Sequence, residues 1–335
     1  MSFVASQLGE FEAIRRFFVR DTGSKSGVIL GIGDDAALLD LPEGSDLVAA
    51  VDTIVAGRHF LEGTDARSIG HRALAVNLSD IAAMGATPLW ATLALTLPSI
   101  DIQWLEGFAA GFMDLADLHA VTLVGGDTTR GALTVSVQIL GSVPHGTALR
   151  RSGGQAGDVL AVSGTLGDAA AGLSFLKMPQ RLARSDVGEL IRRFDYPTPR
   201  VQLGLSARGV ATAAMDLSDG LVGDLPKLAA ASALAAHVRV EQLPLSLALR
   251  SAESSQTRAL DLALGGGDDY ELLLAVPARR FAELKAAANR LNLTLSAIGE
   301  LRSGEGVTWS LNGEEFFPSV SGYDHFGRAT TQITV

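Results

Sequence analysis

Strand-like and helix-like segments alternate along most of this chain, and the alternation restricts the fold to classes that mix helices with sheets. Apolar runs predict strands over 28–31, 47–52, 91–97, 121–124, 133–141, 159–162, 213–217, 271–276 and 293–298. Capping residues and helical spacing predict helices over 65–84, 101–118, 220–235 and 278–290. Glycines and arginines concentrate between residues 144 and 158, which indicates a connection between domains. With 335 residues available, we expect two α/β domains, over 1–148 and 149–335.

Charge and cysteine content exclude several kinds of function. The chain has 27 basic against 37 acidic side chains, a formal net charge of −10, whereas nucleic acids and anionic membranes select basic surfaces. It has no cysteine, which excludes disulfides, thiolate catalysis, zinc–thiolate sites and iron–sulfur clusters. The apolar run 89–97 is far shorter than the ~20 residues that span a bilayer. We expect a cytoplasmic protein with neither a nucleic-acid nor a membrane partner.

Aspartates recur at the ends of predicted strands, mostly beside glycine, or inside an apolar helix. Burying such carboxylates without a cation is costly, and magnesium prefers hard oxygen ligands that it shares with substrate phosphates. We interpret the set as a magnesium and phosphate site, in which glycine-flanked backbone N–H groups are free to bind phosphate. Glycine followed by aspartate is also a common turn or helix cap, and for Asp34, Asp40 and Asp168 both interpretations stay open. The set is Asp35, Asp52, Asp80, Asp127, Asp216 and Asp219.

Other phosphate and catalytic motifs are missing or contradicted. The chain has no P-loop, zinc-protease or serine-hydrolase motif. A Gly31-x-Gly33 pair with Asp52 about 20 residues on is typical of a dinucleotide site. The acidic pair Asp34 and Asp35 would oppose a pyrophosphate there, and too few residues remain for a crossover helix. The dinucleotide interpretation is therefore disfavoured.

Seven sequence strings, in order along the chain, resemble the thiamine-monophosphate kinase family. Within the wider superfamily of aminoimidazole-ribonucleotide synthetase and selenophosphate synthetase, the second and third strings point to the thiamine branch. The resemblance implies an N-terminal mixed sheet with helices on one face, a C-terminal α/β domain, and a homodimer joined through the N-terminal sheet. The strings are GIGDDAALL (31–39), VDTIVAGRHF (51–60), ALAVNLSDIAAMGA (73–86), GGDTTRG (125–131), DLSDGL (216–221), GGGDDYELL (265–273) and GYDHF (322–326).

The resemblance also implies an activity and a set of site residues. The activity is transfer of the ATP γ-phosphoryl group to thiamine monophosphate, with several Mg²⁺ ions and ATP as co-substrate. The six aspartates above match the family's metal positions. ATP contacts fall on Gly126, Asp127, Arg151 and Ser218, and substrate contacts fall on His59, Asp268 and Tyr323. This chain has Asp268 where the family often has glutamate, which puts that contact in doubt.

The chemistry of the acceptor predicts the mechanism. A phosphate monoester has a second pKa near ~6, so its oxygen is already largely ionised at neutral pH. We therefore expect no general base and no catalytic histidine, with positioning and electrostatics supplying most of the catalysis. An alternative stays open: an ATP-binding superfamily member that acts on, or only binds, a different phosphorylated metabolite.

Overall fold

The chain folds into two compact units, one built from residues 1–81 and 86–146 and the other from 82–85 and 147–335. The structure is a computed structural model and describes residues 9–20, 27–178, 185–253 and 255–326. None of the helices in these ranges is both long enough and apolar enough to cross a membrane. Each unit combines helices with its own sheet, so the predicted mixed α/β class with two domains is confirmed.

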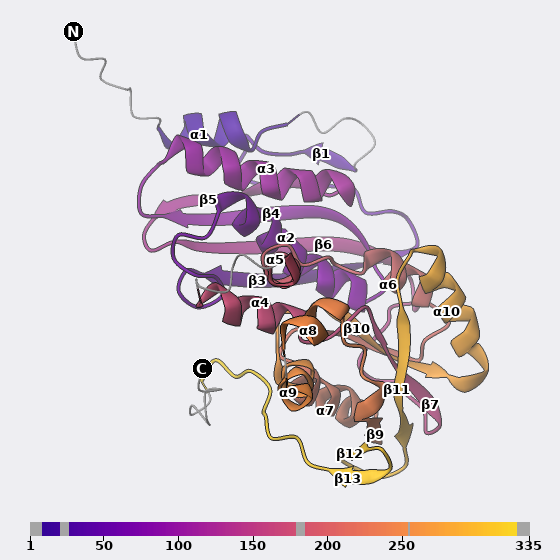
Figure 1. Cartoon of the computed structure of the whole chain (residues 1–335). Helices are drawn as coiled ribbons and strands as arrows, with labels where there is room; N and C mark the ends of the chain where they lie inside the picture. Colours follow the sequence, from indigo (N-terminus) through magenta and orange to yellow (C-terminus); the bar gives the residue numbers. More distant parts are fainter. Residues whose placement is uncertain (1–8, 21–26, 179–184, 254, 327–335) are drawn as a thin grey trace. The chain divides into compact units, whose positions relative to one another are not determined.

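The first unit is built on a four-stranded mixed sheet in the order β3-β6-β4-β5. β6 lies antiparallel to both of its neighbours, and β5 lies parallel to β4 (Figure 1). A small antiparallel pair, β1 with β2, lies outside this sheet. The elements are α1 (Glu10–Phe17), β1 (Val28–Leu30), β2 (Leu38–Leu39), β3 (Ser45–Val55), α2 (Ala66–Ala83), β4 (Thr87–Leu97), α3 (Ile102–Leu118), β5 (Thr122–Arg130) and β6 (Thr134–Pro144).

The two faces of this sheet differ in exposure. Val137 and Ile139 of β6 are fully buried, and Ile81 of α2 lies beside Gly141 on the same strand. Alternate residues point to opposite faces of a strand. Leu47 and Val51 of β3, on the other face, are 54% and 63% exposed. One face of the sheet is therefore covered by helices, and the other presents apolar side chains.

The second unit is built on a seven-stranded sheet in the order β13-β12-β9-β11-β7-β10-β8. Only the pairing of β12 with β9 is parallel. Its strands are β7 (Asp158–Ser163), β8 (Ala213–Leu217), β9 (Ala235–Arg239), β10 (Glu271–Pro277), β11 (Leu295–Arg302), β12 (Val307–Leu311) and β13 (Glu314–Phe316). Its α-helices are α4 (Asp168–Leu176), α5 (Ser185–Asp195), α6 (Val201–Ala207), α7 (Leu221–Ala231), α8 (Leu247–Ala252), α9 (Gln256–Gly265) and α10 (Phe281–Arg290).

The strands β8 and β10 lie at one edge of this sheet and run through the core. Met215 and Leu217 of β8 belong to a buried apolar cluster that also contains residues of α7 and α9. Every residue of β10 from Glu271 to Val276 is buried, so both faces of that strand are covered. The turn after β8 and the loop before β10 are therefore attached to strands that the buried core holds in place.

One predicted helix is wrong over its last residues. The sequence predicts a helix over 220–235, whereas α7 ends at Ala231. Ala233 has a φ of 54°, which a right-handed helix does not allow. The next residues form β9, in which Ala236 and Val238 are buried between β11 and β12. Pairing within the sheet here outweighs the helix preference of an alanine-rich segment.

Candidate active site

The turn after β8 brings together several of the predicted site residues of the second unit. Asp216 is buried in the strand, and Ser218 and Asp219 follow its end. The backbone carbonyl of Ser218 accepts a hydrogen bond from the N–H of Asp268 at 2.9 Å. The carbonyl of Asp219 accepts one from the N–H of Tyr323 at 3.0 Å. Three segments far apart in the sequence therefore meet at this turn.

Asp224 fixes the conformation of that turn from inside α7. Its side chain is 1% exposed, and its Oδ2 accepts hydrogen bonds from the N–H groups of Ser218 (3.0 Å) and Asp219 (2.9 Å). The expectation that backbone N–H groups here are free to bind phosphate is therefore wrong at these two residues, because a carboxylate already uses them. A contact of Ser218 with a phosphate has to use its hydroxyl group.

Lys227 supplies a cation at the same place. Its Nζ lies 2.7 Å from Asp219 Oδ2 and 2.9 Å from Asp224 Oδ1. Burial lowers the pKa of Lys227, but the hydrogen bonds that its ammonium group donates to Asp219 and Asp224 outweigh this effect and raise the pKa overall. Burial raises the pKa of Asp224, an effect that Lys227 partly opposes. The carboxylates of Asp219 and Asp224 therefore bind the positively charged ammonium group of Lys227 in the folded protein.

The loop Gly265–Tyr270, which joins α9 to β10, carries Asp268. Both Asp268 (φ 70°) and Tyr270 (φ 50°) have left-handed backbones, which is uncommon for residues other than glycine. The N–H of Tyr270 donates to the carbonyl of Leu217 at 2.9 Å, next to the Asp268 bond described above. At Gly267 a β-carbon would lie 2.4 Å from the Ser218 carbonyl oxygen, so only glycine fits this close approach.

The Tyr323 side chain lies at the surface. It is 48% exposed, and its ring stands edge-on to that of His325 with 4.9 Å between the ring centres. The Tyr323 hydroxyl is 3.3 Å from His325 Nδ1. Because the Tyr323 backbone is bonded to Asp219, the exposed ring is held close to the turn after β8.

In the first unit, Asn77 links the helix that carries Asp80 to the strand that carries Asp52. Asn77 is fully buried, and its Oδ1 accepts the N–H of Asp52 at 3.0 Å. Its Nδ2 donates to the carbonyl of Ala73 at 2.9 Å. Asp80 lies one helical turn further along α2 and is partly buried. Asn77 and Asp80, three residues apart, therefore lie on one face of α2.

Asp52 and Asp127 lie on opposite edges of the four-stranded sheet. Asp52 of β3 pairs with Val137, Val137 with Leu93, and Leu93 with Gly126 of β5, the residue before Asp127. Three strand spacings of about 4.8 Å separate the two edges by about 14 Å. One ion cannot therefore touch both carboxylates within this unit.

Gly126 itself has a conformation that other residues cannot adopt. Its φ is 151°, and a β-carbon would lie 1.9 Å from the carbonyl oxygen of Leu93. The predicted ATP contact at Gly126 thus coincides with a place where only bare backbone fits against β4.

The expectation that all six aspartates are buried holds only for Asp216, because Asp52, Asp80 and Asp219 are partly buried. Asp35 and Asp127 are exposed, whereas Asp216 is 6% exposed. Asp35 is the second residue of a surface turn, in which its N–H donates to Asp34 Oδ1 at 2.8 Å. This contact favours the turn interpretation of Asp34. Burial cost consequently gives no argument for a cation at Asp35 or Asp127, and their metal roles stay predictions.

His59 is held by its own turn. Val55 donates its backbone N–H to His59 Nδ1 at 3.0 Å, and the His59 N–H donates to the Val55 carbonyl at 3.0 Å. Because Nδ1 accepts a hydrogen bond, the neutral ring carries its proton on Nε2. The side chain is partly buried, and its orientation is fixed independently of any ligand.

Arg151 lies away from the turn after β8. It is exposed, and its carbonyl accepts the hydroxyl of Ser232 at 3.0 Å. The preceding Arg150 pairs with Ala214, four residues before Ser218 on the strand, which corresponds to about 13 Å. The two predicted ATP contacts of the second unit are therefore not neighbours.

Among the described residues, no three histidine, aspartate or glutamate side chains lie close enough together to hold a metal ion. A magnesium ion that shares substrate phosphates and water needs only one or two protein carboxylates. The carboxylates of the six aspartates supply hard oxygen donors that fit ions of that kind, although the ammonium group of Lys227 already occupies Asp219 Oδ2.

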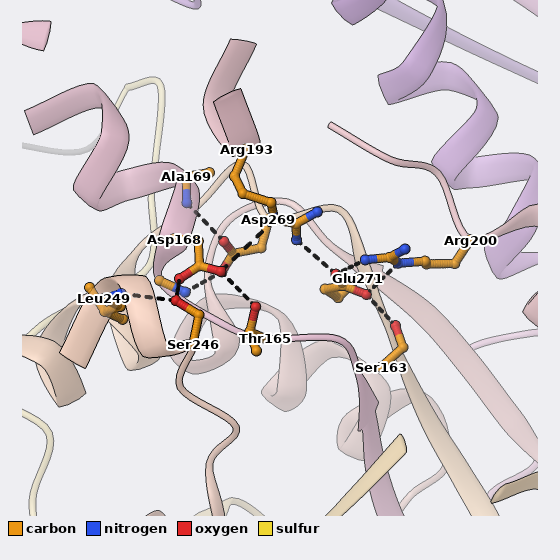
Figure 2. Close-up of polar contacts among 11 residues, drawn as sticks. Ser163, Thr165, Asp168, Ala169, Arg193, Arg200, Ser246, Leu249, Asp269 and Glu271 are labelled. Atoms are coloured by element: carbon orange, nitrogen blue, oxygen red, sulfur yellow. Dashed lines mark hydrogen bonds and ion pairs between the residues drawn. The ribbon is translucent and has the colours of Figure 1, made fainter. Parts of the chain in front are cut away.

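A buried ionic cluster adjoins the loop Gly265–Tyr270 (Figure 2). The sequence patterns did not predict this cluster. Glu271 is fully buried and accepts hydrogen bonds from Ser163 Oγ (2.5 Å), Arg193 (2.8 Å) and Arg200 Nε (2.7 Å). A second bond joins Arg200 to Glu271 Oε1. Arg193 also faces Asp168 at 3.9 Å.

Asp168 and Asp269 complete this cluster around the start of α4. Asp168, the first residue of α4, accepts the hydroxyl groups of Thr165 and Ser246, each at 2.6 Å. The cap interpretation of Asp168 is wrong, because Gly167 is the N-cap residue of this helix. Asp269 accepts the N–H groups at Gly167 and Ala169. Burial raises the pKa of Asp269 to about 8 against the opposing effect of these bonds. The string GGGDDYELL contains both Asp269 and Glu271 and was the available signal for this cluster.

Comparison with known proteins gives the same assignment over most of the chain. The model of the AIR synthase related protein N-terminal domain matches residues 33–143, and that of the C-terminal domain matches residues 155–311. The thiamine-monophosphate kinase of Escherichia coli K12 is 46% identical over 321 residues, covering 95% of this chain and 98% of the relative.

Two solved structures extend the comparison. The thiamine-monophosphate kinase of Stenotrophomonas maltophilia K279a superposes with a TM-score of 0.82 at 48% identity, covering 88% of this chain and 93% of that one. AaThiL complexed with AMPPCP and TMP superposes with a TM-score of 0.76 at 32% identity, covering 88% and 92%. The chain belongs to the thiamine-monophosphate kinase family.

Proposed function

We propose that this enzyme transfers the γ-phosphoryl group of ATP to the phosphate of thiamine monophosphate, giving thiamine diphosphate and ADP. The observation that carries the proposal is the meeting of Ser218, Asp268 and Tyr323 at one turn. These residues match the family's nucleotide and substrate contacts, and they come from three separate segments. A related structure with AMPPCP and TMP bound supports both ligands.

The chain's own residues act by holding the two substrates. The acceptor phosphate is already largely ionised at neutral pH, so no general base is required. Ser218 offers its hydroxyl to ATP, because its N–H is bonded to Asp224. Asp268 and the exposed ring of Tyr323 take the acceptor substrate. In the first unit, His59 is fixed on its turn with Nε2 protonated and matches a substrate contact of the family.

Magnesium ions would be held by the six aspartates, Asp35, Asp52, Asp80, Asp127, Asp216 and Asp219. When bound, these ions neutralise the charge of the phosphates as the two anions come together in line. The separation of Asp52 from Asp127 by about 14 Å supports several ions rather than one.

An ATP-dependent assay with separate acceptors tests the activity. Thiamine monophosphate should be converted to thiamine diphosphate, and free thiamine should not, because it lacks the anionic phosphate oxygen. Turnover of free thiamine at a comparable rate would contradict the proposal. No turnover of thiamine monophosphate, with ATP still bound, would favour the superfamily member that acts on or binds another phosphorylated metabolite.

We also propose that the enzyme works as a cytoplasmic homodimer. Leu47 and Val51 present an exposed apolar face on the sheet of the first unit, and Ile29 and Leu38 of the small pair are 70% and 54% exposed. Apolar faces and strand edges of this kind are usually covered by a partner. Light scattering should give twice the chain mass, and Val51→Asp should give the monomer mass. A monomer at all concentrations of the unsubstituted chain would contradict the dimer.

A further inference from the structure

The loop Gly265–Tyr270 has an unfavourable backbone conformation that something must hold in place. Two of its residues, Asp268 and Tyr270, are left-handed although neither is glycine. Such conformations cost free energy and persist where the surroundings impose them. The backbone bonds to Leu217 and Ser218 hold one side of the loop.

The Asp269 side chain holds the other side. It is 3% exposed, its Oδ2 accepts the Gly167 N–H at 2.6 Å, and its Oδ1 accepts the Ala169 N–H at 3.2 Å (Figure 2). The donors are Gly167, the N-cap residue of α4, and Ala169 in its first turn. Asp168 between them is held in the buried cluster by Thr165 and Ser246. The loop is thus pinned between β8 and α4.

The side chain of Asp269 makes different contacts from those of its neighbours Asp268 and Tyr270. The Tyr270 hydroxyl donates to Asp268 Oδ1 at 3.3 Å, so these two side chains lie together, whereas the Asp269 side chain is turned to α4. Burial raises the pKa of Asp269, and a protonated carboxyl group still has a lone pair on each oxygen for the two N–H donors. The anchoring contact therefore persists when the group is neutral.

We propose that Asp269 is a positioning residue, which pins the loop Gly265–Tyr270 to the first turn of α4 and thereby orients Asp268 toward the acceptor substrate. The proposal rests on the proposed function for the identity of that substrate. The proposal goes beyond the proposed function because Asp269 is assigned no contact with any ligand and acts through Asp268.

The test compares Asp269→Asn with a matched control, Asp158→Asn, in the full chain. Asp158 is also a buried aspartate, 4% exposed, whose Oδ2 accepts the Gln155 N–H at 2.8 Å and the Thr212 hydroxyl at 2.5 Å. It pairs with Pro277 at the far end of β10, so it shares the sheet but not the loop. Both variants should lower the melting temperature.

The two variants should differ in substrate binding and in loop protection. Asp269→Asn should raise the KM for thiamine monophosphate about tenfold while kcat and the KM for ATP change less than about threefold. Hydrogen exchange at the amides of Asp268 and Tyr270 should become at least about tenfold faster. Asp158→Asn should leave all four quantities within about twofold of those of the unsubstituted enzyme.

A second variant tests the same contact by changing a residue that donates a hydrogen bond to Asp269. Ala169→Pro removes one of the two N–H donors, at the second residue of α4, where the N–H group has no partner within the helix. It should raise the KM for thiamine monophosphate and speed exchange at Asp268 in the same direction, by a smaller factor. If Asp269→Asn does not fold, the KM and the exchange rate of Ala169→Pro test the proposal instead.

Several results would overturn the proposal. They are an unchanged KM for thiamine monophosphate in both loop variants, a KM rise that Asp158→Asn shares, or unchanged exchange at Asp268 and Tyr270. Failure of the proposed function is seen separately, because the unsubstituted enzyme would then not phosphorylate thiamine monophosphate. The exchange measurement still tests the anchor in that case.

Discussion

Replacement of Glu271 by glutamine tests whether the buried cluster stabilises the second unit. The carboxylate is fully buried and accepts hydrogen bonds from Ser163, Arg193 and Arg200. Glutamine keeps the shape but removes the charge, and it turns a donor group toward a guanidinium. With Asp269 protonated, the charges of Asp168 and Glu271 balance the two arginines, so the variant leaves a buried excess of one positive charge.

The size of the effect follows from these contacts. Removing one partner of a buried ion pair costs about 3–5 kcal/mol. Arg193 keeps Asp168 at 3.9 Å as a second carboxylate, so we expect the lower end, about 3 kcal/mol. For a unit of this size, each kcal/mol corresponds to about 2–4 °C in melting temperature, which gives a fall of about 6–12 °C.

Thermal melting by circular dichroism measures the fall, and hydrogen exchange at residues 272–276 locates it in β10. Glu300→Gln is the matched control, because its pair with Arg302 is equally short (2.7 Å) but 40% and 50% exposed. An exposed pair contributes less than about 1 kcal/mol. Equal shifts for Glu271→Gln and Glu300→Gln would refute the reasoning, since burial would then make no difference.

Further predictions concern pH, metal binding and His59. The folded-state pKa of Asp269, about 8 against 3.8 for the unfolded chain, means that the folded state holds an extra proton between these values. The free energy of unfolding of the unsubstituted protein, relative to that of Asp269→Asn, should therefore fall as pH rises from about 4 to about 8. Chemical denaturation of both proteins at pH 5 and pH 7.5 measures this difference. A difference that grows with pH would contradict the prediction. Asp219→Asn should weaken Mn²⁺ binding, measured by electron paramagnetic resonance, at least about tenfold, while the control Asp261→Asn should not. His59→Ala should raise the KM for thiamine monophosphate with kcat within about threefold; a loss of kcat by ~10³ at constant KM would mean that His59 transfers a proton.

Sequence patterns predicted the elements that depend on local signals. The strand over 213–217 is found as β8 with the same bounds, and the helix over 101–118 begins after Asp101, whose side chain accepts two backbone N–H groups. The helix predicted through residue 235 was wrong because strand pairing at β9 is decided by partners about 60 residues away. Local propensity does not contain that information.

The candidate site was predictable to a similar extent. The string that contains Asp268 drew attention to the loop before β10, but the string does not say which of its two aspartates faces α4. The sequence patterns also did not predict exposure, because Asp35 follows the apolar strand β1 and Asp127 lies within β5, yet both side chains are at the surface. Arg193 and Arg200 belong to no motif, and only the fold brings them to Glu271.

The joint hold of Arg193 and Arg200 on one carboxylate has a consequence for variation within the family. The arginines bracket six residues, Phe194 to Pro199, and Glu271 closes them into a small ring without a covalent bond. Both ends must reach the same carboxylate, so the length of this connection is constrained more tightly than its sequence. We expect relatives that retain the three charged residues to tolerate substitutions between the arginines and to lack insertions there.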